Sequence, residues 1–242
     1  MEDKRLQKIL SACGYGSRRD CEKIINEGRV AVNREIAKLG DRAIFDYDLI
    51  TVDGKEISEK YSEYIYIIVN KPINVLSDIK DKYNRIKVID LIDIDRYLFI
   101  AGRLDYRSEG LILLTDDGEI ANRLTHPRYE HEKEYLVLVD KELSNTQLEK
   151  WRKGVVLSDG YKTLPAIVDT VSTHVEGYWI TVILREGKKR QIREVGKKLE
   201  VHVNRIIRTR IGPISLGNLK SGKYRILNEK EIFTLRKYCL VK

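Results

Sequence analysis

Cysteine is scarce in this sequence: only Cys13, Cys21 and Cys239 occur among 242 residues. The count is odd and no C-x-x-C pair is present, which argues against a disulfide framework and against a thiolate metal site. Histidine is rare as well, and its four residues show neither an H-E-x-x-H pattern nor the helical i, i+4 spacing of a metal site. We therefore expect no metal ion, and we expect the chain to work in a reducing compartment.

Long apolar runs are also missing. No run approaches the roughly 20 residues that a membrane helix needs, so no membrane partner is expected. The first ten residues, MEDKRLQKIL, carry charge where a signal peptide would need an apolar core. The sequence contains no cofactor motif. These absences predict a cytoplasmic (bacterial) or organellar protein that uses no cofactor.

Charge, in contrast, is plentiful and unevenly distributed. Charged residues make up 34% of the chain, and the formal net charge is +8. Residues 1–60 are neutral overall, residues 61–182 carry a net charge of −4, and residues 183–242 carry +12. A basic excess confined to the last quarter is typical of a surface that binds a polyanion, but also of a solvated basic surface, and charge alone leaves both open.

The first 60 residues predict a helix, a turn, a second helix and short strands. One face of the first helix is apolar at i, i+3, i+4 and i+7 spacing: Leu6, Ile9, Leu10 and Cys13. Ser17 and Asp20 have the spacing of a capping box at the start of the second helix. Residues 49–57 read as a hairpin that turns at Asp53-Gly54. The polar segment 58–63 is a candidate linker, which gives an N-terminal domain over residues 1–60.

From Tyr64 onward, β-favouring runs alternate with a few helical patterns. Strands are expected within YIYIIVN, YLFIAGRLD, GLILLTDD, EYLVLVD, AIVDTVS and YWITVIL. Helices are expected over residues 119–124, 144–154 and 189–200. Many strands with few helices predict an α+β domain over residues 64–242, with a mixed, mainly antiparallel sheet flanked by helices.

The segment between two of these strands, GRLDYRSEG, is unusual because one carboxylate, Asp105, lies between Arg103 and Arg107. Loops that a rigid scaffold positions commonly carry functional side chains. Taken alone, however, an aspartate between two strands is more often a turn former or a member of a surface ion pair. The local pattern does not decide between these interpretations.

A comparison over a longer stretch of the sequence does decide between them. Residues 102–118, GRLDYRSEGLILLTDDG, resemble the G-R-L-D-x-x-T-x-G-L-L-L-L-T-x-D-G signature of pseudouridine synthases, in particular the ribosomal RNA enzymes of the RsuA/RluB type. Other blocks follow in the family's order: NKP, HPRYEHEKEYLV, REGKKRQIREV and NRIIRTRIGPISLGNL. Residues 1–60 resemble the S-four type (alpha-L) RNA-binding domain that commonly precedes this catalytic domain. The departures are Ser108 for Thr, Arg107 for Asp or Asn, and Asn74 for Gly.

The resemblance implies that the chain isomerises a uridine to pseudouridine in ribosomal RNA, without a cofactor. The large-subunit enzymes are the more similar group, and a small-subunit enzyme is the alternative. By the same resemblance, Asp105 is the nucleophile, Arg193 pairs with it, Tyr135 stacks on the extruded base, and Arg103 fills the gap that the base leaves. An ion pair at about 4 Å, at an effective dielectric of about 20, is worth about 4 kcal/mol and would keep the carboxylate charged despite desolvation.

Basic residues are expected to bind RNA in both domains. They are Arg103, Lys71, Arg18, Arg19, Lys23, Lys188, Lys189, Arg190, Arg205 and Arg208, with Lys197, Lys198 and Arg210 beside them. Lys71 is expected to support either the site itself or its RNA. The last quarter would bind phosphates near the site, so affinity would fall steeply with salt. The expected partner is ribosomal RNA, free or within a pre-ribosomal subunit, and the expected state is a monomer.

Two other functions fit parts of the pattern. The first is a non-catalytic RNA-binding factor in ribosome assembly, against which the intact Asp105, Tyr135 and Arg193 set argues. The second is an RNA glycosidase that uses Asp105 and Glu109 as paired carboxylates. The cationic surroundings of Asp105 argue against that alternative.

Overall fold

The computed structural model describes residues 3–58, 63–174 and 177–240 of the chain. It separates into two compact units, which are residues 1–64 with 94–99 and 116–118, and residues 65–93, 100–115 and 119–242. Most of the candidate linker, residues 59–62, lies outside the described residues. Within the described part of the chain, no helix is long and apolar enough to cross a membrane.

The N-terminal unit has two helices, α1 (Leu6–Ala12) and α2 (Arg18–Asn26). Its strands are β1 (Lys4–Arg5), β2 (Val30–Val32), β3 (Glu35–Ile36), β4 (Arg42–Ala43), β5 (Ile50–Val52) and β6 (Lys55–Glu56). Four of them form a sheet in the order β3-β2-β5-β6, and β1 pairs with β4.

Local sequence signals account for much of this unit. The predicted apolar face of α1 is buried in its core, and the predicted capping box at the start of α2 is present, with Ser17 Oγ accepting from Asp20 N at 3.0 Å. The predicted hairpin is β5–β6, whose turn residues Asp53 and Gly54 both have positive φ. These three predictions are confirmed. They could be made from the sequence because each feature depends on residues close together in the chain.

The second unit is built on one large sheet. Its long strands are β7 (Tyr66–Lys71), β9 (Glu109–Thr115), β10 (Lys133–Val139), β11 (Ile167–His174), β12 (Gly177–Leu184) and β13 (Val203–Ile211). Shorter strands are β8 (Phe99–Ala101), β14 (Ile214–Ser215) and β15 (Tyr224–Ile226). The order is β11-β12-β10-β13-β9-β7-β15, with β8 beside β9 and β14 beside β13. Only β9–β13 is parallel among the registers of the described strands, so the predicted mixed, mainly antiparallel sheet is confirmed.

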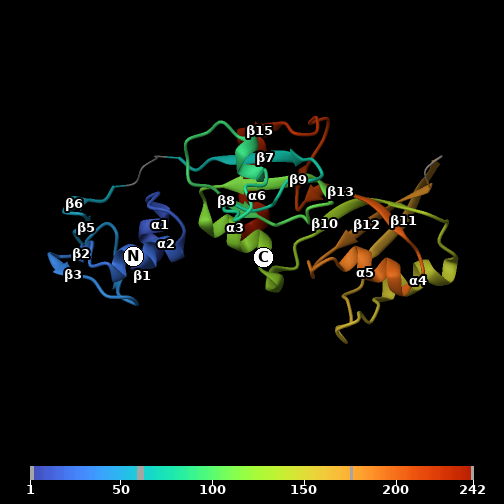
Figure 1. Ribbon diagram of the computed structural model, residues 1–242, viewed down its shortest axis with the longest axis horizontal. Helices are drawn as coiled ribbons and strands as arrows, with labels where there is room; N and C mark the ends of the chain where they lie inside the picture. The colour runs from blue at the N-terminus through green and yellow to red at the C-terminus, as the bar shows by residue number, and fades with distance from the viewer. Residues whose placement is uncertain (1–2, 59–62, 175–176, 241–242) are drawn as a thin grey trace. The chain divides into compact units, whose positions relative to one another are not determined.

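Helices flank this sheet, as Figure 1 shows. They are α3 (Gly118–Thr125), α4 (Asn145–Lys153), α5 (Gln191–Lys198) and α6 (Glu229–Leu240), with short 3-10 turns η1 (Val88–Leu91) and η2 (Pro127–Tyr129). Helices α4 and α5 accompany the β10–β12–β11 half (Figure 1), and Arg123 of α3 donates to the Cys239 carbonyl of α6 at 3.2 Å. Helices α3, α4 and α5 match the predicted ones.

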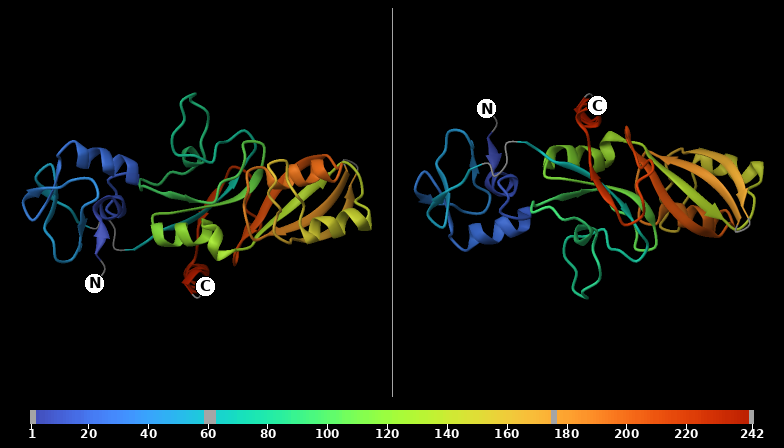
Figure 2. Two further views of the ribbon diagram at one scale, coloured as in Figure 1. Left: turned by 90° about the horizontal axis from the view of Figure 1, so that it is seen from below. Right: turned by 90° about the horizontal axis from the view of Figure 1, so that it is seen from above.

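One segment of this unit leaves the sheet. Between β7 and η1 the chain projects outward, and both views in Figure 2 show it in teal to green. Within it, Asp81 accepts hydrogen bonds from the Arg85 guanidinium and from the backbone of Tyr83 and Arg85. The part of this segment nearest β7 supports the candidate site.

Candidate active site

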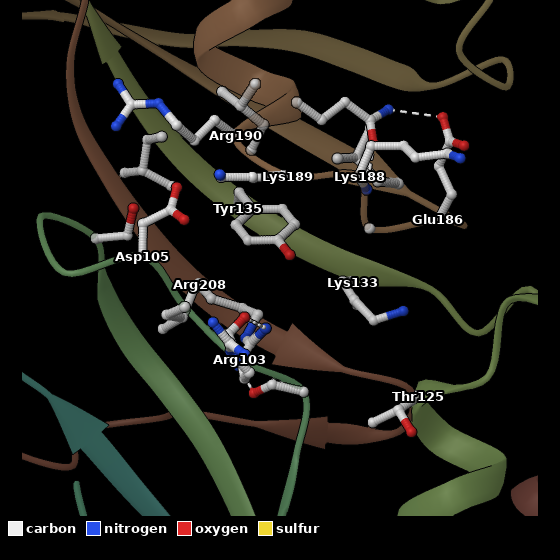
Figure 3. Close-up of a pocket in the computed structure, with 18 of the residues that line it drawn as sticks. Arg103, Asp105, Thr125, Lys133, Tyr135, Glu186, Lys188, Lys189, Arg190 and Arg208 are labelled. Carbon is white, nitrogen blue, oxygen red and sulfur yellow. Dashed lines mark hydrogen bonds between the residues drawn. The ribbon is translucent and has the colours of Figure 1, made fainter. Parts of the chain in front are cut away.

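The loop that follows β8 opens onto a pocket of about 560 Å³. Its lining comes from the loop 100–108, from residues 125–135 before and within β10, from the turn 184–192 before α5, and from β13. Figure 3 shows Asp105, Tyr135, Arg103, Arg208 and the basic residues of the turn gathered around it. Segments far apart in sequence therefore meet in one cavity.

Asp105 is half-buried and lines this pocket. Its backbone carbonyl accepts from Ser108 N at 3.0 Å, which tightens the loop after it. Within the part of the chain that the structure describes, its carboxylate makes no side-chain hydrogen bond and no ion pair closer than 4.0 Å. The carboxylate is therefore available to a substrate in the pocket.

The backbone on either side of Asp105 is fixed by residues from the projecting segment. Ser77 Oγ donates to the carbonyl of Leu104 at 2.8 Å and accepts from the amide of Leu104 at 3.0 Å. Asn74 N donates to the Tyr106 carbonyl at 2.8 Å. Because these bonds hold the backbone immediately before and after Asp105, the backbone that presents its side chain to the pocket is positioned before any substrate binds.

The position of Arg208 contradicts its expected role in RNA binding. It was expected to bind RNA, but its side chain is only 1% exposed and lies beneath the loop. Nε donates to the Leu111 carbonyl at 2.7 Å, Nη2 to Gly102 at 2.9 Å and Nη1 to Arg103 at 3.3 Å. Burial lowers the pKa of Arg208, and the nearby Tyr135 opposes that shift. Its role in this structure is to join β13 to β9 and to the loop.

Gly110 is the glycine of the SEGL stretch, and its surroundings show why no other residue fits there. It has φ +103° and lies in β9 where that strand runs parallel to β13. A Cβ at this position would lie 2.3 Å from the Arg208 carbonyl oxygen and 2.6 Å from its amide nitrogen. Only glycine allows both the backbone conformation and the close approach of the two strands.

Arg193 also differs from its expected geometry. Its guanidinium donates to the carbonyl of Val203 at 2.7 Å and to that of Arg107 at 3.4 Å, and among the described residues it forms no ion pair with Asp105. It lines an adjacent hollow of about 550 Å³. Burial and Arg190 lower the pKa of Arg193, while Asp105 opposes them, so the two charges interact through space without contact.

Tyr135 is 8% exposed and belongs to β10, opposite Arg208 in β13 and Val182 in β12. A register shift between Glu134 and Tyr135 interrupts the β10–β13 ladder next to the pocket. Figure 3 shows the ring facing the cavity between Asp105 and the basic turn. A planar aromatic face in this position can stack on a flat base.

The basic turn before α5 forms one rim of the pocket. Lys188, Lys189 and Arg190 are exposed and line it, as Arg103 does from the opposite loop. The turn is held by Glu186, which is buried. Its carboxylate accepts from Tyr161 Oη at 2.6 Å, Gln191 Nε2 at 2.7 Å and Leu164 N at 2.8 Å. The four exposed cations of the rim, which are Arg103, Lys188, Lys189 and Arg190, are accessible to a phosphate backbone that approaches the pocket.

Two further residues expected to bind RNA have other partners. Lys71 is fully buried, and its Nζ donates to the carbonyls of Pro72 at 2.8 Å and Val75 at 2.9 Å. Burial lowers the pKa of Lys71 to about 8, and the nearby Glu109 and Asp105 oppose that shift. Lys71 thus supports the turn after β7, and its expected contact with RNA is corrected.

Arg205 binds Glu109 through two bonds, at 2.7 and 2.9 Å, and neither residue lines the pocket. The expected phosphate contact of Arg205 would compete with this ion pair. The same pair bears on the glycosidase alternative, because the Glu109 carboxylate is directed to Arg205 and not to a substrate shared with Asp105. The glycosidase alternative therefore lacks the second carboxylate that it requires.

The remaining expected residues lie elsewhere. Arg18, Arg19 and Lys23 are exposed on α2 of the N-terminal unit. Lys197 lines the hollow beside Arg193, and Arg210 pairs with Glu132 and Glu134. They are therefore not part of the pocket lining.

Two residues of the site were not anticipated. Ser77 has no sequence signal, because its partner Leu104 is 27 residues away. Lys133 lines the pocket two residues before Tyr135 on the same strand. The period of two along a strand could have identified it, since alternate residues point to the same face.

Comparisons with known proteins identify the family. The model of the RNA pseudouridylate synthase family matches residues 65–197, and that of the S4 domain matches residues 4–43. The chain is 38% identical to an uncharacterized RNA pseudouridine synthase of Aquifex aeolicus over 240 residues, covering 98% of this chain and 95% of that protein. It is 37% identical to ribosomal large subunit pseudouridine synthase B of Pseudomonas aeruginosa, covering 95% of this chain and 61% of that protein.

The solved structures agree. A crystal structure of a pseudouridylate synthase has a TM-score of 0.68 at 28% identity, covering 96% of this chain and 99% of that one. The predicted resemblance and fold class are thus confirmed. The chain belongs to the RNA pseudouridylate synthase family: it is an isomerase that acts on uridine in RNA, and it carries an S4 domain ahead of its catalytic sheet.

Proposed function

We propose that this enzyme isomerises one uridine in ribosomal RNA of the large subunit, with Asp105 as the nucleophile. Several relatives at 36–40% identity bear the name ribosomal large subunit pseudouridine synthase B, which supports the choice of substrate. A small-subunit target is the alternative. The substrate would be ribosomal RNA, free or within a pre-ribosomal subunit, and we expect a monomer in the bacterial cytoplasm or an organelle.

The observation that carries the assignment of Asp105 is its carboxylate, which has no ion-pair partner among the described residues and lies in the pocket beside Tyr135. In the reaction, the bond from C1′ to N1 breaks with its electrons on the base, and a new bond joins C1′ to C5. The proton leaves C5, and N1 gains one, so the product is an isomer. Asp105 would attack the uridine or stabilise the cationic sugar during this exchange.

A uridine must leave its stack to enter the pocket, at a cost of a few kcal/mol. Tyr135 would offset part of this cost by stacking on the base, and the exposed guanidinium of Arg103 would take the place that the base leaves. Arg193 would stabilise the charge of Asp105 through space. The basic rim would bind the flanking phosphates of the RNA.

The N-terminal S4 domain would position the RNA. Arg18, Arg19 and Lys23 are exposed on α2. Arg18 and Arg19 open the helix, where its dipole adds to the attraction of a phosphate, whereas Lys23 lies in its last turn. Because these residues belong to a different unit from the pocket, they would contribute to affinity and not to the chemical step.

Mapping pseudouridine in ribosomal RNA from cells with and without this gene tests the proposal. We expect one large-subunit site to disappear, and to return with the wild-type gene but not with Asp105→Asn. Glu109→Gln serves as the matched carboxylate control and should restore the site, because Glu109 does not line the pocket. A missing small-subunit site would favour the alternative, and an unchanged ribosomal RNA would refute the proposed substrate.

A further inference from the structure

Lys133 lies in the same pocket as Asp105 and Tyr135, at the first position of β10. Residues 133 and 135 share a face of the sheet, because side chains alternate along a strand. Figure 3 shows Asp105 and Lys133 at different ends of the pocket, with the Tyr135 ring between them in this view. A base stacked on Tyr135 with its sugar at Asp105 would direct its far edge toward Lys133.

The Lys133 ammonium group is only partly satisfied by the protein. Its Nζ donates to the His131 carbonyl at 3.1 Å, and it forms no ion pair with a carboxylate of residues 3–58, 63–174 or 177–240. An ammonium has three donors, so further hydrogen bonds remain to be made. Burial and, to a smaller extent, the charge of Arg208 lower the pKa of Lys133 to about 8. A half-buried cation without a counterion favours an acceptor that brings negative charge.

The isomerisation creates such an acceptor. When the bond from C1′ to N1 breaks, its electron pair remains on the uracil ring and is shared with the O2 and O4 carbonyl oxygens. A donor placed at one of these oxygens stabilises the separated base more than the intact nucleoside, and this difference is what accelerates the step.

Other cations of the pocket are less suited to this task. The Arg208 guanidinium is committed to three backbone carbonyls. Arg103 and the basic turn before α5 are exposed at the rim, where water weakens their effect on a charge inside. Lys133 combines partial burial in the pocket, a cationic head and donors that the protein leaves unfilled.

We propose that Lys133 is a further catalytic residue, which donates a hydrogen bond to a uracil carbonyl and stabilises the negative charge that the base gains when it separates from the sugar. The inference rests on the assignment of this pocket as the active site. It names the residue that acts on the base, whereas Asp105 acts on the other part of the nucleotide.

The test compares Lys133→Met and Lys133→Arg with the wild type in single-turnover assays, on the ribosomal RNA in which the wild type forms pseudouridine. We expect Met to lower the rate constant about 100-fold, while the Kd for RNA changes by less than about threefold. Arg should recover at least a tenth of the wild-type rate, since it keeps the charge. Lys150→Met, an exposed lysine of α4, is the matched control and should behave as wild type.

The pH profile separates catalysis from structure. The active lysine is protonated and its pKa is lowered to about 8, so the wild-type rate should fall as the pH rises above about 8. The Arg variant stays protonated and should keep its rate to about pH 9.5. The other titratable and charged groups of the pocket lining remain in this variant, so the difference between the two profiles reports Lys133. They are Arg103, Asp105, His126, His131, Tyr135, Arg185, Glu186, Lys188, Lys189, Arg190 and Arg208.

Two results would overturn the inference: a Met variant as fast as wild type, or an Arg variant with the same decline above pH 8. Melting curves of both variants identify a simple loss of folding, and in that case the comparison of Arg with wild type still decides. Asp105→Asn is assayed in parallel. If Asp105→Asn is inactive and Lys133→Met is unimpaired, the inference fails while the proposed function stands; if Asp105→Asn is active, the pocket itself is wrongly assigned.

Discussion

At the scale of single residues, the site depends on one buried arginine. Arg208 donates to three backbone carbonyls, two of which belong to the loop that leads to Asp105. Its aliphatic and cationic parts are both buried, so the desolvation of the charge is offset by these bonds and by the nearby Tyr135. A shorter or neutral side chain would leave the carbonyls without donors.

Arg208→Met should therefore destabilise the protein. Each buried carbonyl that loses its donor costs about 1–3 kcal/mol, so the free energy of unfolding should fall by at least about 3 kcal/mol. Urea unfolding of the full chain measures this. Arg205→Met is the matched control on the same strand. It removes an ion pair whose arginine side chain is 48% exposed, which is worth about 1 kcal/mol or less. Equal losses for the two variants would contradict the structural role of Arg208.

From the sequence, a motif could indicate which residues belong to the site, but not where each side chain points, and the roles assigned to these residues stay predictions. Asp105, Tyr135 and Arg103 were selected from the resemblance, and the structure gathers them at one pocket. The burial of Arg208 and Lys71 could not be foreseen, because arginine and lysine are mostly exposed in proteins. Their partners are backbone carbonyls, which leave no trace in the sequence.

At the scale of elements, the parallel pairing of β9 with β13 is the contact that assembles the site. It brings the end of the loop that carries Asp105 against the strand that carries Arg208. Strand β13 carries three arginines and was recognised only as part of a family block, because its apolar and basic residues do not alternate cleanly. Helix α6 was not predicted either; Phe233 lies 69% exposed in it, so its apolar residues form no single stripe.

The close approach of these strands predicts the effect of Gly110→Ala. The positive φ costs about 1–3 kcal/mol for a residue with a Cβ, and the overlap with the Arg208 backbone adds about 1–3 kcal/mol. Gly160→Ala is the control, because Gly160 also has positive φ but has open space around the added Cβ. The Gly110 variant should lose roughly 2 kcal/mol more than the Gly160 variant in urea unfolding. A smaller loss at Gly110 than at Gly160 would show that the strands can separate without cost.

At the scale of the whole molecule, the domain order follows from composition and local patterns. The change from helical to β-favouring runs near residue 64 falls between the matches of the two family models, residues 4–43 and 65–197, and the exact domain bounds stay a prediction. The basic excess of the last quarter is divided in the structure: part of it forms the rim of the pocket, and part is bound to carboxylates or carbonyls. Net charge left a polyanion-binding surface and a solvated basic surface both open, and it did not indicate which cations line the pocket.

If the S4 domain contributes to affinity and the pocket to the chemical step, the salt dependence of RNA binding should change when the basic residues of α2 are replaced. Changing Arg18, Arg19 and Lys23 to glutamine should weaken binding to ribosomal RNA about tenfold and lower the slope of log affinity against log salt by about 2, since each lost phosphate contact contributes about 0.7–0.9. The single-turnover rate at saturating protein should stay within twofold. The matched control changes Arg34, Lys38 and Lys55, which are exposed in the same unit. If both triple variants bind alike, α2 does not contact the RNA.

The most direct test of the central claim is the rate at which purified Asp105→Asn forms pseudouridine in the ribosomal RNA that the wild type modifies, with RNA affinity and melting temperature measured on the same samples. The substitution keeps the size of the side chain and removes only its charge and nucleophilicity. We predict a rate lower by a factor of at least about 1,000, with affinity within threefold of wild type and an unchanged fold. A rate within tenfold of wild type would contradict the assignment of Asp105 as the nucleophile.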